Sequence, residues 1–341
     1  MRKRYTVIDT EFHHVPWEAA EKAKHLPGPG PYGDLKFSAI VDNLDSTYSK
    51  FFSLEACLEH MEKCGVDMAL IGQATWTIAS LDVCKIINDE LAREAASFPG
   101  KFIPLAHVPP LDGQPAMDEL DRAVHELGMK AIAVTTSQQQ GVTIDDERMK
   151  PFFRKASELR VPVVVHPTVK TPVWGGTKYF MSGSVSREYD IVKSLVEVLC
   201  GVLPEFPDLR FLFSHYGGGA PFLLGRIMSW YTPPNSAVPK DLVGKPRTYA
   251  EFLECGLKEG FDALLDQIYF NTAGTGGWLP ALKQALLVLK PERICFGSDY
   301  PFEMARASDY TGSISDVGSL DLPEQQTRDI LGENAKRLFN V

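Results

Sequence analysis

The sequence predicts an α/β protein of the (β/α)8 TIM-barrel class, and two observations carry that prediction. Eight short apolar runs, rich in β-branched residues, alternate with eight longer segments of helical period along the 341 residues, which is the element count of a closed parallel barrel. Several runs are almost continuously apolar, as in Val161–Val165, which is typical of strands covered on both faces. A dinucleotide-binding doubly wound sheet would carry a glycine-rich turn after the first strand, whereas Glu11-Phe12-His13-His14 follows it here.

Each predicted element rests on local periodicity and on the residues that end it. The predicted strands are Tyr5–Asp9, Asp67–Ile71, Phe102–His107, Lys130–Thr135, Val161–His166, Arg210–His215, Gln267–Thr272 and Arg293–Ser298. The predicted helices are Leu54–Cys64, Leu81–Ser97, Ala116–Leu127, Met149–Leu159, Glu188–Val202, Tyr249–Leu265, Leu279–Leu289 and Glu324–Leu338. Many of these helices stop at a glycine or a proline, such as Gly65, Gly100 or Pro291, because these residues favour helix ends.

We expect one barrel domain over residues 1–341, with two insertions. Residues 14–52, which contain Gly28-Pro29-Gly30-Pro31, follow the first strand, and residues 228–248, which contain Pro233-Pro234, follow the sixth. Loops of that length in a compact domain are usually functional. Both emerge on the face where barrel active sites form, so we interpret them as a lid or a dimer arm.

Composition excludes several classes of partner. Lys and Arg number 35 against 44 Asp and Glu, for a net charge of -9, so the chain lacks the cationic excess of a nucleic-acid binder. Its longest apolar runs fall well short of the ~18 residues of a spanning helix, so no membrane partner is expected. The six cysteines form no C-x-x-C pair, which indicates reduced core thiols and a cytoplasmic protein. A small molecule is the expected partner.

Five polar residues fall at the carboxyl ends of predicted strands. Glu11 and His13 follow the first strand, His166 ends the fifth, His215 ends the sixth, and Asp299 follows the eighth. In a barrel all these ends point into one mouth. A single histidine at a strand end is more often a hydrogen-bonded structural residue than a ligand, but four such placements at one rim favour a metal site. Carboxylates and imidazoles form the ligand set of zinc, manganese or iron(II).

The other histidines serve as a comparison. His107 ends the third predicted strand and could reach the mouth, either to support a ligand or to contact substrate. His14 follows His13 directly and should face away from the metal. His25, His60 and His125 lie in insertion or helical segments and receive no role.

Four segments resemble the signatures of a known family. They are Ile8–His13, Val165–Pro167, Ser214–Arg226 with its H-x-G-G-G run, and Phe296–Phe302 with G-S-D-Y-P-F. Together they are similar to the amidohydrolase-related metal-dependent decarboxylases, which include the aminocarboxymuconate-semialdehyde, γ-resorcylate and 5-carboxyvanillate decarboxylases. The similarity runs from the first strand to the last helix.

This resemblance implies a ligand set and a catalytic histidine. The implied metal ligands are Glu11, His13, His166 and Asp299, and His215 is the implied catalytic residue beside the metal. The fourth strand ends Ala133–Thr136 without the lysine that bridges two metals in binuclear amidohydrolases, so one divalent ion, Zn²⁺ or Mn²⁺, is expected. Arg226 matches a family arginine that pairs with a substrate carboxylate in a neighbouring subunit, which implies a homodimer. A surface ion pair is the alternative for Arg226.

Two departures leave the substrate open. Glu11 replaces the first histidine of the muconate-type enzyme, and this extra carboxylate favours manganese over zinc. Resorcylate-type members carry H-x-G-E, whereas Gly218 occupies the fourth position here. The second substrate arginine of the muconate enzyme has no match in residues 14–52, whose only Lys and Arg residues are Lys22, Lys24, Lys36 and Lys50.

Three functions are compatible with this site. The resemblance favours non-oxidative decarboxylation of an aromatic or unsaturated, muconate-type carboxylic acid, in which His215 or Asp299 delivers a proton to the carbon bearing the carboxylate. The same residues would also serve a mononuclear hydrolase or hydratase acting on a carboxylated lactone, ester or ring, in which His215 activates water. A non-catalytic metal-binding scaffold is the third option, which the presence of all four ligand positions disfavours.

Overall fold

The described part of the chain is organised around eight parallel strands. The computed structural model describes residues 5–23, 52–138, 141–168, 181–231, 261–303 and 307–341, together with residues 26, 50 and 179. Its strands are β1 (Ile8–His13), β2 (Met68–Gly72), β3 (Phe102–Ala106), β4 (Ala131–Thr135), β5 (Val163–His166), β6 (Phe211–Phe213), β7 (Ile268–Asn271) and β8 (Ile294–Cys295). They pair in sequence order, each parallel to the next.

Backbone hydrogen bonds between the first strand and the residues after the last one close the ring. The Thr10 N–H donates to the carbonyl of Phe296 at 2.9 Å, and the His13 N–H donates to the carbonyl of Tyr300 at 2.8 Å. The (β/α)8 prediction is therefore confirmed, and the carboxyl ends of distant strands meet at one mouth.

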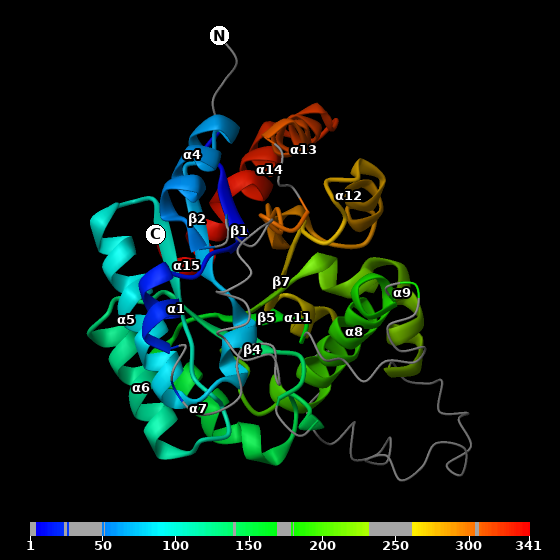
Figure 1. Cartoon of the computed structure of the whole chain (residues 1–341). Coiled ribbons are helices and arrows are strands. Elements are labelled where there is room, and N and C mark those ends of the chain that lie inside the picture. The colour runs from blue at the N-terminus through cyan, green and yellow to red at the C-terminus, as the bar shows by residue number, and fades with distance from the viewer. Residues whose placement is uncertain are drawn as a thin grey trace.

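Helices cover the outside of the ring (Figure 1). They are α1 (Trp17–Ala23), α4 (Leu54–Cys64), α5 (Leu81–Ser97), α6 (Gln114–His125), α7 (Lys150–Leu159), α8 (Arg187–Glu197), α9 (His215–Tyr231), α11 (Phe261–Leu265), α12 (Leu279–Ala285), α13 (Ala307–Ser319), α14 (Glu324–Arg328) and α15 (Asn334–Phe339). The helices predicted at Leu54–Cys64 and Leu81–Ser97 have the predicted bounds. Gly65 ends α4 in the left-handed region, at φ 75°, as its sequence position indicated.

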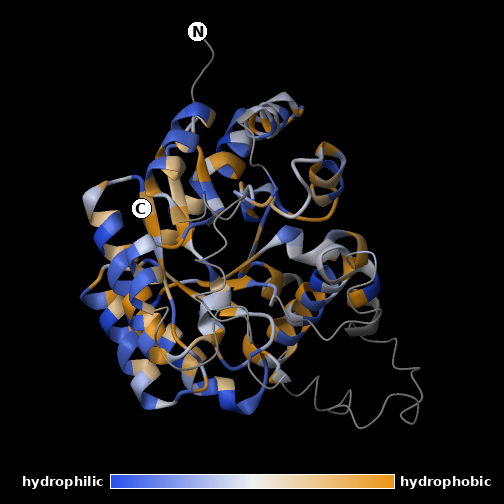
Figure 2. Ribbon diagram, viewed as in Figure 1, coloured by the Kyte–Doolittle hydropathy of each residue, from blue (hydrophilic) through white to orange (hydrophobic). Residues whose placement is uncertain are grey.

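Apolar side chains fill both sides of the sheet. Every residue of β1, β3, β4 and β5 is buried. One apolar cluster lies inside the ring and includes Ile8, Leu70 and Leu212. A larger one lies between the strands and the helices, and Figure 2 shows the helices with hydrophobic and hydrophilic residues alternating along them. This double burial explains the continuous apolar runs of the sequence.

The first and last strands differ from the prediction. Strand β1 begins at Ile8 and continues to His13, because Phe12 and His13 still pair with Ile71 and Gly72 of β2. Glu11 and His13 therefore lie within the strand and not after it. Strand β8 ends at Cys295, whereas the predicted strand ends at Ser298. Beyond Cys295 the chain is joined to β1 by isolated backbone hydrogen bonds and not by a continuous ladder.

The last predicted helix, Glu324–Leu338, is interrupted. A π-helical segment, Asp329–Glu333, separates α14 from α15. Within it, a Cβ on Gly332 would lie 2.6 Å from the carbonyl oxygen of Thr6, so the segment packs directly on the chain that enters β1. A second π segment, Val198–Val202, continues α8 to the predicted end.

The two predicted insertions lie largely outside the described residues. Of residues 14–52, the structure describes residues 14–23, which include α1, a helix that the sequence did not predict, and residues 26, 50 and 52. Of residues 228–248, it describes only the end of α9, and of the predicted helix Tyr249–Leu265 only α11. The five described cysteines form no disulfide with one another, and Cys255 lies outside the described residues. No helix in the described part of the chain is long and apolar enough to cross a bilayer.

Candidate functional site

Four side chains from three parts of the barrel converge at its mouth. Glu11 and His13 come from the end of β1, His166 from the end of β5, and Asp299 from the segment after β8. Nε2 of His13 lies 2.8 Å from Oδ1 of Asp299 and 3.9 Å from Oε1 of Glu11. Nε2 of His166 lies 3.5 Å from the same glutamate oxygen. All four residues are buried, so the ligand candidates named from the sequence do meet.

The His166 imidazole is oriented as a metal ligand would be. Its Nδ1 lies 2.9 Å from the carbonyl oxygen of Pro167, so Nδ1 carries the proton and Nε2 presents a lone pair to the cluster. That Nε2 is buried and has no hydrogen-bond partner. The atoms offered by Glu11, His13 and His166 all lie within 4.8 Å of one another, as do those of Glu11, His215 and Asp299. This set of carboxylates and imidazoles fits one divalent ion.

His215 lies beside these ligands on a strained turn. It is two residues beyond the end of β6 and has φ 55°, a conformation that is uncommon for residues other than glycine and clusters at functional sites. Its Nε2 lies 3.1 Å from Oε1 of Glu11. A Cβ on Gly274 would lie 2.3 Å from Cγ of His215. The turn around Gly274 therefore packs against the ring face and fixes its position.

Asn271 at the end of β7 connects Glu11 to the His215 turn. Its side-chain oxygen accepts hydrogen bonds from the N–H groups of His215, at 3.0 Å, and Ala273, at 3.2 Å. Its amide nitrogen donates to Oε2 of Glu11 at 2.5 Å. Asn271 thus orients a ligand candidate and the catalytic candidate together. Sequence reasoning did not single it out, although a polar residue that ends an apolar strand was the signal used elsewhere.

Glu188 occupies the other side of the His215 ring. Nδ1 of His215 donates to Oε1 of Glu188 at 2.7 Å, and the glutamate side chain is 28% exposed. Glu188 belongs to the first turn of α8. The loop holding His215 approaches this turn closely, since a Cβ on Gly218 would lie 2.1 Å from the carbonyl oxygen of Glu188. No sequence motif pointed to Glu188.

Asp9 supports the site from within the barrel. Its carboxylate accepts from the N–H groups of Glu11 and Ser298, at 3.0 and 3.1 Å, and from the Ser298 hydroxyl at 2.5 Å. The Tyr310 hydroxyl donates to the same group. Burial raises the pKa of Asp9 to about 6, although these hydrogen bonds oppose the shift. Asp9 therefore ties β1 to the segment that carries Asp299.

The charges of the cluster are set by burial and by mutual contact. Burial opposes ionisation of Glu11, but His215, His166 and His13 together hold its pKa well below the usual range. Burial also opposes protonation of His215, but Glu11 and Glu188 hold the pKa of its imidazole well above 6.5. For His166, burial holds the pKa well below 6.5. Burial thus favours the neutral form of His166, and contact with two carboxylates favours the charged form of His215.

A family comparison agrees with this geometry. The amidohydrolase family model matches residues 52–341, which is most of the chain. The chain belongs to the amidohydrolase family.

Two sequence relatives and one solved structure are similar to this amidohydrolase. It is 26% identical over 276 residues to the gamma-resorcylate decarboxylase of a Rhizobium strain, covering 77% of each chain. It is 23% identical over 359 residues to the 2-keto-4-carboxy-3-hexenedioate hydratase of Sphingobium, covering 98% of this chain and 94% of the relative. The 5-carboxyvanillate decarboxylase of Novosphingobium aromaticivorans, solved with manganese and 4-hydroxy-3-methoxy-5-nitrobenzoic acid, has a TM-score of 0.80 at 20% identity, covering 100% and 97% of the two chains. This last similarity supports the fold.

Two strand-end placements in the amidohydrolase require correction. His215 was expected to end the sixth strand, but β6 stops at Phe213 and His215 begins the next turn. Asp299 was expected directly after the eighth strand, but it lies beyond the end of β8 with φ 56°. Both residues reach the mouth through left-handed turns and not through strand register.

Arg226 and His107 are not among the residues whose ligand atoms group together at the mouth. Arg226 is an exposed residue of α9, so the structure does not bring it to the ligands within the described chain. His107 is fully buried, and its Nε2 accepts the N–H of Gln73 at 3.2 Å. Burial lowers the pKa of His107 to about 4, which keeps its ring neutral.

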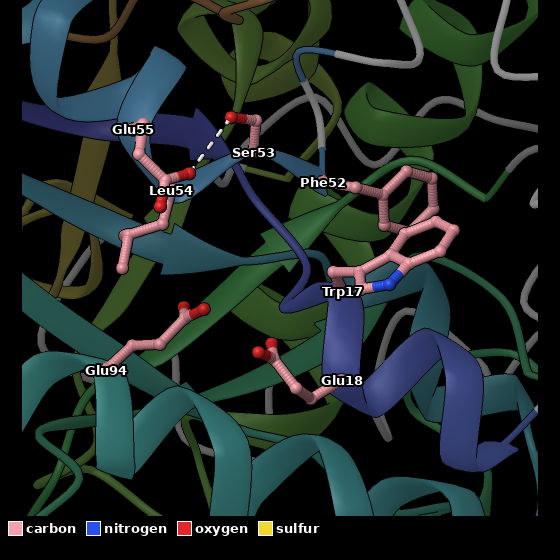
Figure 3. A pocket seen from close by; sticks show the side chains of 7 residues that line it. All are labelled: Trp17, Glu18, Phe52, Ser53, Leu54, Glu55 and Glu94. Atoms are coloured by element: carbon pink, nitrogen blue, oxygen red, sulfur yellow. Dashed lines mark hydrogen bonds between the residues drawn. The ribbon is translucent and has the colours of Figure 1, made fainter.

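The amidohydrolase also has a separate cavity of about 460 Å³ beside the barrel. Its lining includes Trp17 and Glu18 of α1 and Glu94 of α5, and Figure 3 shows Glu18 and Glu94 pointing toward one another across it.

Oε2 of Glu94 lies 2.7 Å from Nε2 of His14. His14 therefore turns away from the ligand cluster, as predicted. Burial opposes its protonation, but Cys57 and Glu94 raise the pKa of His14 to about 10.

Proposed function

We propose that this amidohydrolase is a metal-dependent, non-oxidative decarboxylase of an aromatic or unsaturated, muconate-type carboxylic acid. The observation that carries the proposal is the His215 imidazole held between two carboxylates beside a buried set of four ligand candidates. A cationic imidazole at that place is a proton donor, and proton delivery to carbon is what such a decarboxylation requires. The decarboxylase relatives support the same reaction class.

Glu11, His13, His166 and Asp299 would hold a single divalent ion. Two carboxylates and two imidazoles form a harder ligand set than one rich in histidine, so we propose manganese in preference to zinc. The manganese in the related decarboxylase structure supports this choice. When bound, the ion acts as a Lewis acid that holds and polarises the substrate carboxylate and a neighbouring oxygen.

His215 supplies the proton. Its Nε2–H transfers to the substrate carbon that carries the carboxylate, and the new C–H bond interrupts conjugation. The bond between that carbon and the carboxylate then breaks, its electron pair returns to the conjugated system, and CO2 leaves. Glu188 and Glu11 hold His215 charged before the transfer. Asp299 is the second candidate for the proton transfer, because it lies within the same group of ligand atoms.

A hydratase or hydrolase is the second candidate function. The hydratase relative aligns over nearly the whole length of both chains, and a histidine between two carboxylates also suits activation of water. In that reaction His215 would accept a proton from water, so it would have to start neutral. The contact between Nδ1 of His215 and Glu188, which is not a ligand candidate, favours the charged ring and so supports the decarboxylase.

We also propose that Arg226 acts across a homodimer interface. Its exposed position on α9 is compatible with reaching a second copy of the chain. Arg226→Ala should then weaken turnover of a dicarboxylic acid while the metal content stays the same. Unchanged kinetics, or a monomer by light scattering, would remove Arg226 from the site.

Metal analysis and a substrate panel test the proposed function. Purified protein should carry close to one divalent ion per chain, and chelated protein should regain more activity with manganese than with zinc. The panel contains hydroxybenzoates and muconate-type acids, assayed for released CO2, alongside lactones, esters and unsaturated keto acids. CO2 release supports the decarboxylase. Turnover only in the second group, without CO2, would assign a hydrolase or hydratase instead.

A further inference from the structure

Arg187 is held beside the candidate site by its neighbours in the chain. It is the first residue of α8, directly after a π-helical turn, Ser182–Ser186, and π segments are frequent at functional sites. The next residue, Glu188, contacts Nδ1 of His215 at 2.7 Å. The close approach of Gly218 to the Glu188 backbone also fixes this turn against the site.

The Arg187 side chain has an unusual lack of partners. Its Nε is buried and has no hydrogen-bond partner. No carboxylate of the described residues forms an ion pair with it, whereas Arg122 and Arg148 pair with carboxylates at 2.7 and 2.8 Å. A buried, unsatisfied N–H on a cationic group is costly. We interpret this unsatisfied N–H beside the candidate site as a group that a ligand completes.

The guanidinium also acts on the ligand cluster. The Arg187 charge is among the causes that lower the pKa of His166, so the guanidinium lies within electrostatic reach of that ligand candidate. Three carboxylates, those of Glu11, Asp299 and Glu188, lie around the same centre. One divalent ion and the charged form of His215 would offset these three charges, so each carboxylate that an anionic substrate adds needs a further cation close by.

We propose that Arg187 binds a second carboxylate of the substrate, and that the substrate is therefore a dicarboxylic acid. A guanidinium offers Nε–H and one Nη–H as a parallel pair that matches the two oxygens of a carboxylate. The first carboxylate would lie at the ligand cluster and the second at Arg187. This inference rests on the proposed function for the identity of the reaction, but the binding itself does not depend on turnover.

Kinetics of an arginine variant form the first part of the test. Arg187→Gln removes the charge and keeps a polar side chain. With 5-carboxyvanillate, which has two carboxylates, KM should rise roughly tenfold or more, while KM for 2,6-dihydroxybenzoate, which has one, should stay within about twofold. The KM of Arg187→Lys for 5-carboxyvanillate should lie between the values of the unmodified protein and of Arg187→Gln. The matched control is Arg154→Gln on the exposed face of α7, which should behave as the unmodified protein.

Calorimetric binding of inert acids separates this proposal from the proposed reaction. Isophthalate and benzoate are titrated into manganese-loaded protein, with metal content and Tm measured for each variant. Preference for isophthalate over benzoate that disappears in Arg187→Gln, but not in Arg154→Gln, supports the assignment even if no acid is decarboxylated. Equal loss of affinity for both acids, or no loss for either, would overturn it.

Discussion

The carboxylate of Glu188 lies 2.7 Å from Nδ1 of His215, and Glu11 lies 3.1 Å from Nε2 of the same ring. The His215 ring therefore contacts carboxylates on two sides, one from β1 and one from α8. Because both ring nitrogens face carboxylates, the ring is fixed in orientation and favoured in its charged form. Glu188 does this without belonging to the ligand set, so its contribution can be measured separately from metal binding.

Removal of the Glu188 carboxylate should slow the reaction without removing the metal. Glu188→Ala is expected to lower kcat about 10- to 100-fold, as for other residues that orient a group in a metal site, with little change in KM. Glu188→Gln retains a hydrogen-bond acceptor and should recover part of the loss. Metal analysis and steady-state kinetics check this. Tyr189→Phe, at the exposed next position, is the control. Wild-type kcat in Glu188→Ala would contradict the positioning role.

Gly274 and Gly276 provide a matched pair that tests the packing of His215. Both have positive φ, 80° and 56°, so alanine strains the backbone at either position. Only at Gly274 would the added Cβ meet the His215 ring, at 2.3 Å, because nothing lies within 4 Å at Gly276. Gly274→Ala should lose most activity, and Gly276→Ala should lose only stability. Equal activity in the two variants, compared at matched folded fractions, would disprove the contact.

The sequence predicted the fold and the ligand candidates because both follow from local patterns. Continuous apolar runs mark strands buried on both faces, and polar residues at their ends mark one mouth. The predicted end of the first strand, at Asp9, is wrong because it was also taken from a local pattern, the polarity of the residues that follow. Glu11 and His13 look like loop residues by polarity, but their backbones continue to pair with β2 while their side chains enter the cluster.

The supporting residues could not be predicted because their roles depend on tertiary contacts. Glu188 lies in the first turn of α8, and its approach to His215 depends on the left-handed turn at Gly218. Asn271 ends a strand like several ligand candidates, yet it binds Glu11 and the His215 backbone. Nothing in the spacing of these residues indicates these partners. The missing partner of Arg187 is visible only once its surroundings are known.

Asn271 should control metal affinity through Glu11. Asn271→Ala removes the donor to Oε2 of Glu11 and the acceptor for the His215 N–H. Loss of such a partner weakens metal binding about 10- to 100-fold in comparable sites. Competition with a chelating dye measures the affinity. Gln284→Ala, at an exposed position of α12, is the control. An unchanged metal affinity in folded Asn271→Ala would mean that Glu11 does not need this hydrogen bond.

His60 should make the stability of the fold depend on pH. The ring is buried, stacks on Tyr300 at 4.1 Å between centroids, and lies 3.5 Å from the Cys64 thiol. Burial, with Lys50 and Lys63 adding to it, lowers the pKa of His60 to about 4 from 6.5. The unfolded chain therefore binds this proton at higher pH than the folded one does. The contribution of the neutral ring to the free energy of unfolding is therefore fully present above pH 6.5, and it is lost as the pH falls from 6.5 toward 4.

Replacement of His60 by phenylalanine should flatten that part of the stability curve. His60→Phe keeps an aromatic ring against Tyr300 but has no proton to bind. Because a shift of this size corresponds to about 3 kcal/mol at most, the free energy of unfolding of the unmodified protein should fall more steeply between pH 6.5 and pH 4 than that of His60→Phe. Urea denaturation at several pH values measures the difference, and His125→Phe, at an exposed position of α6, should follow the unmodified protein. Carboxylates and His107 contribute equally to the pH dependence of both proteins. Parallel curves for the unmodified protein and His60→Phe would therefore show that the buried His60 ring does not titrate in this range.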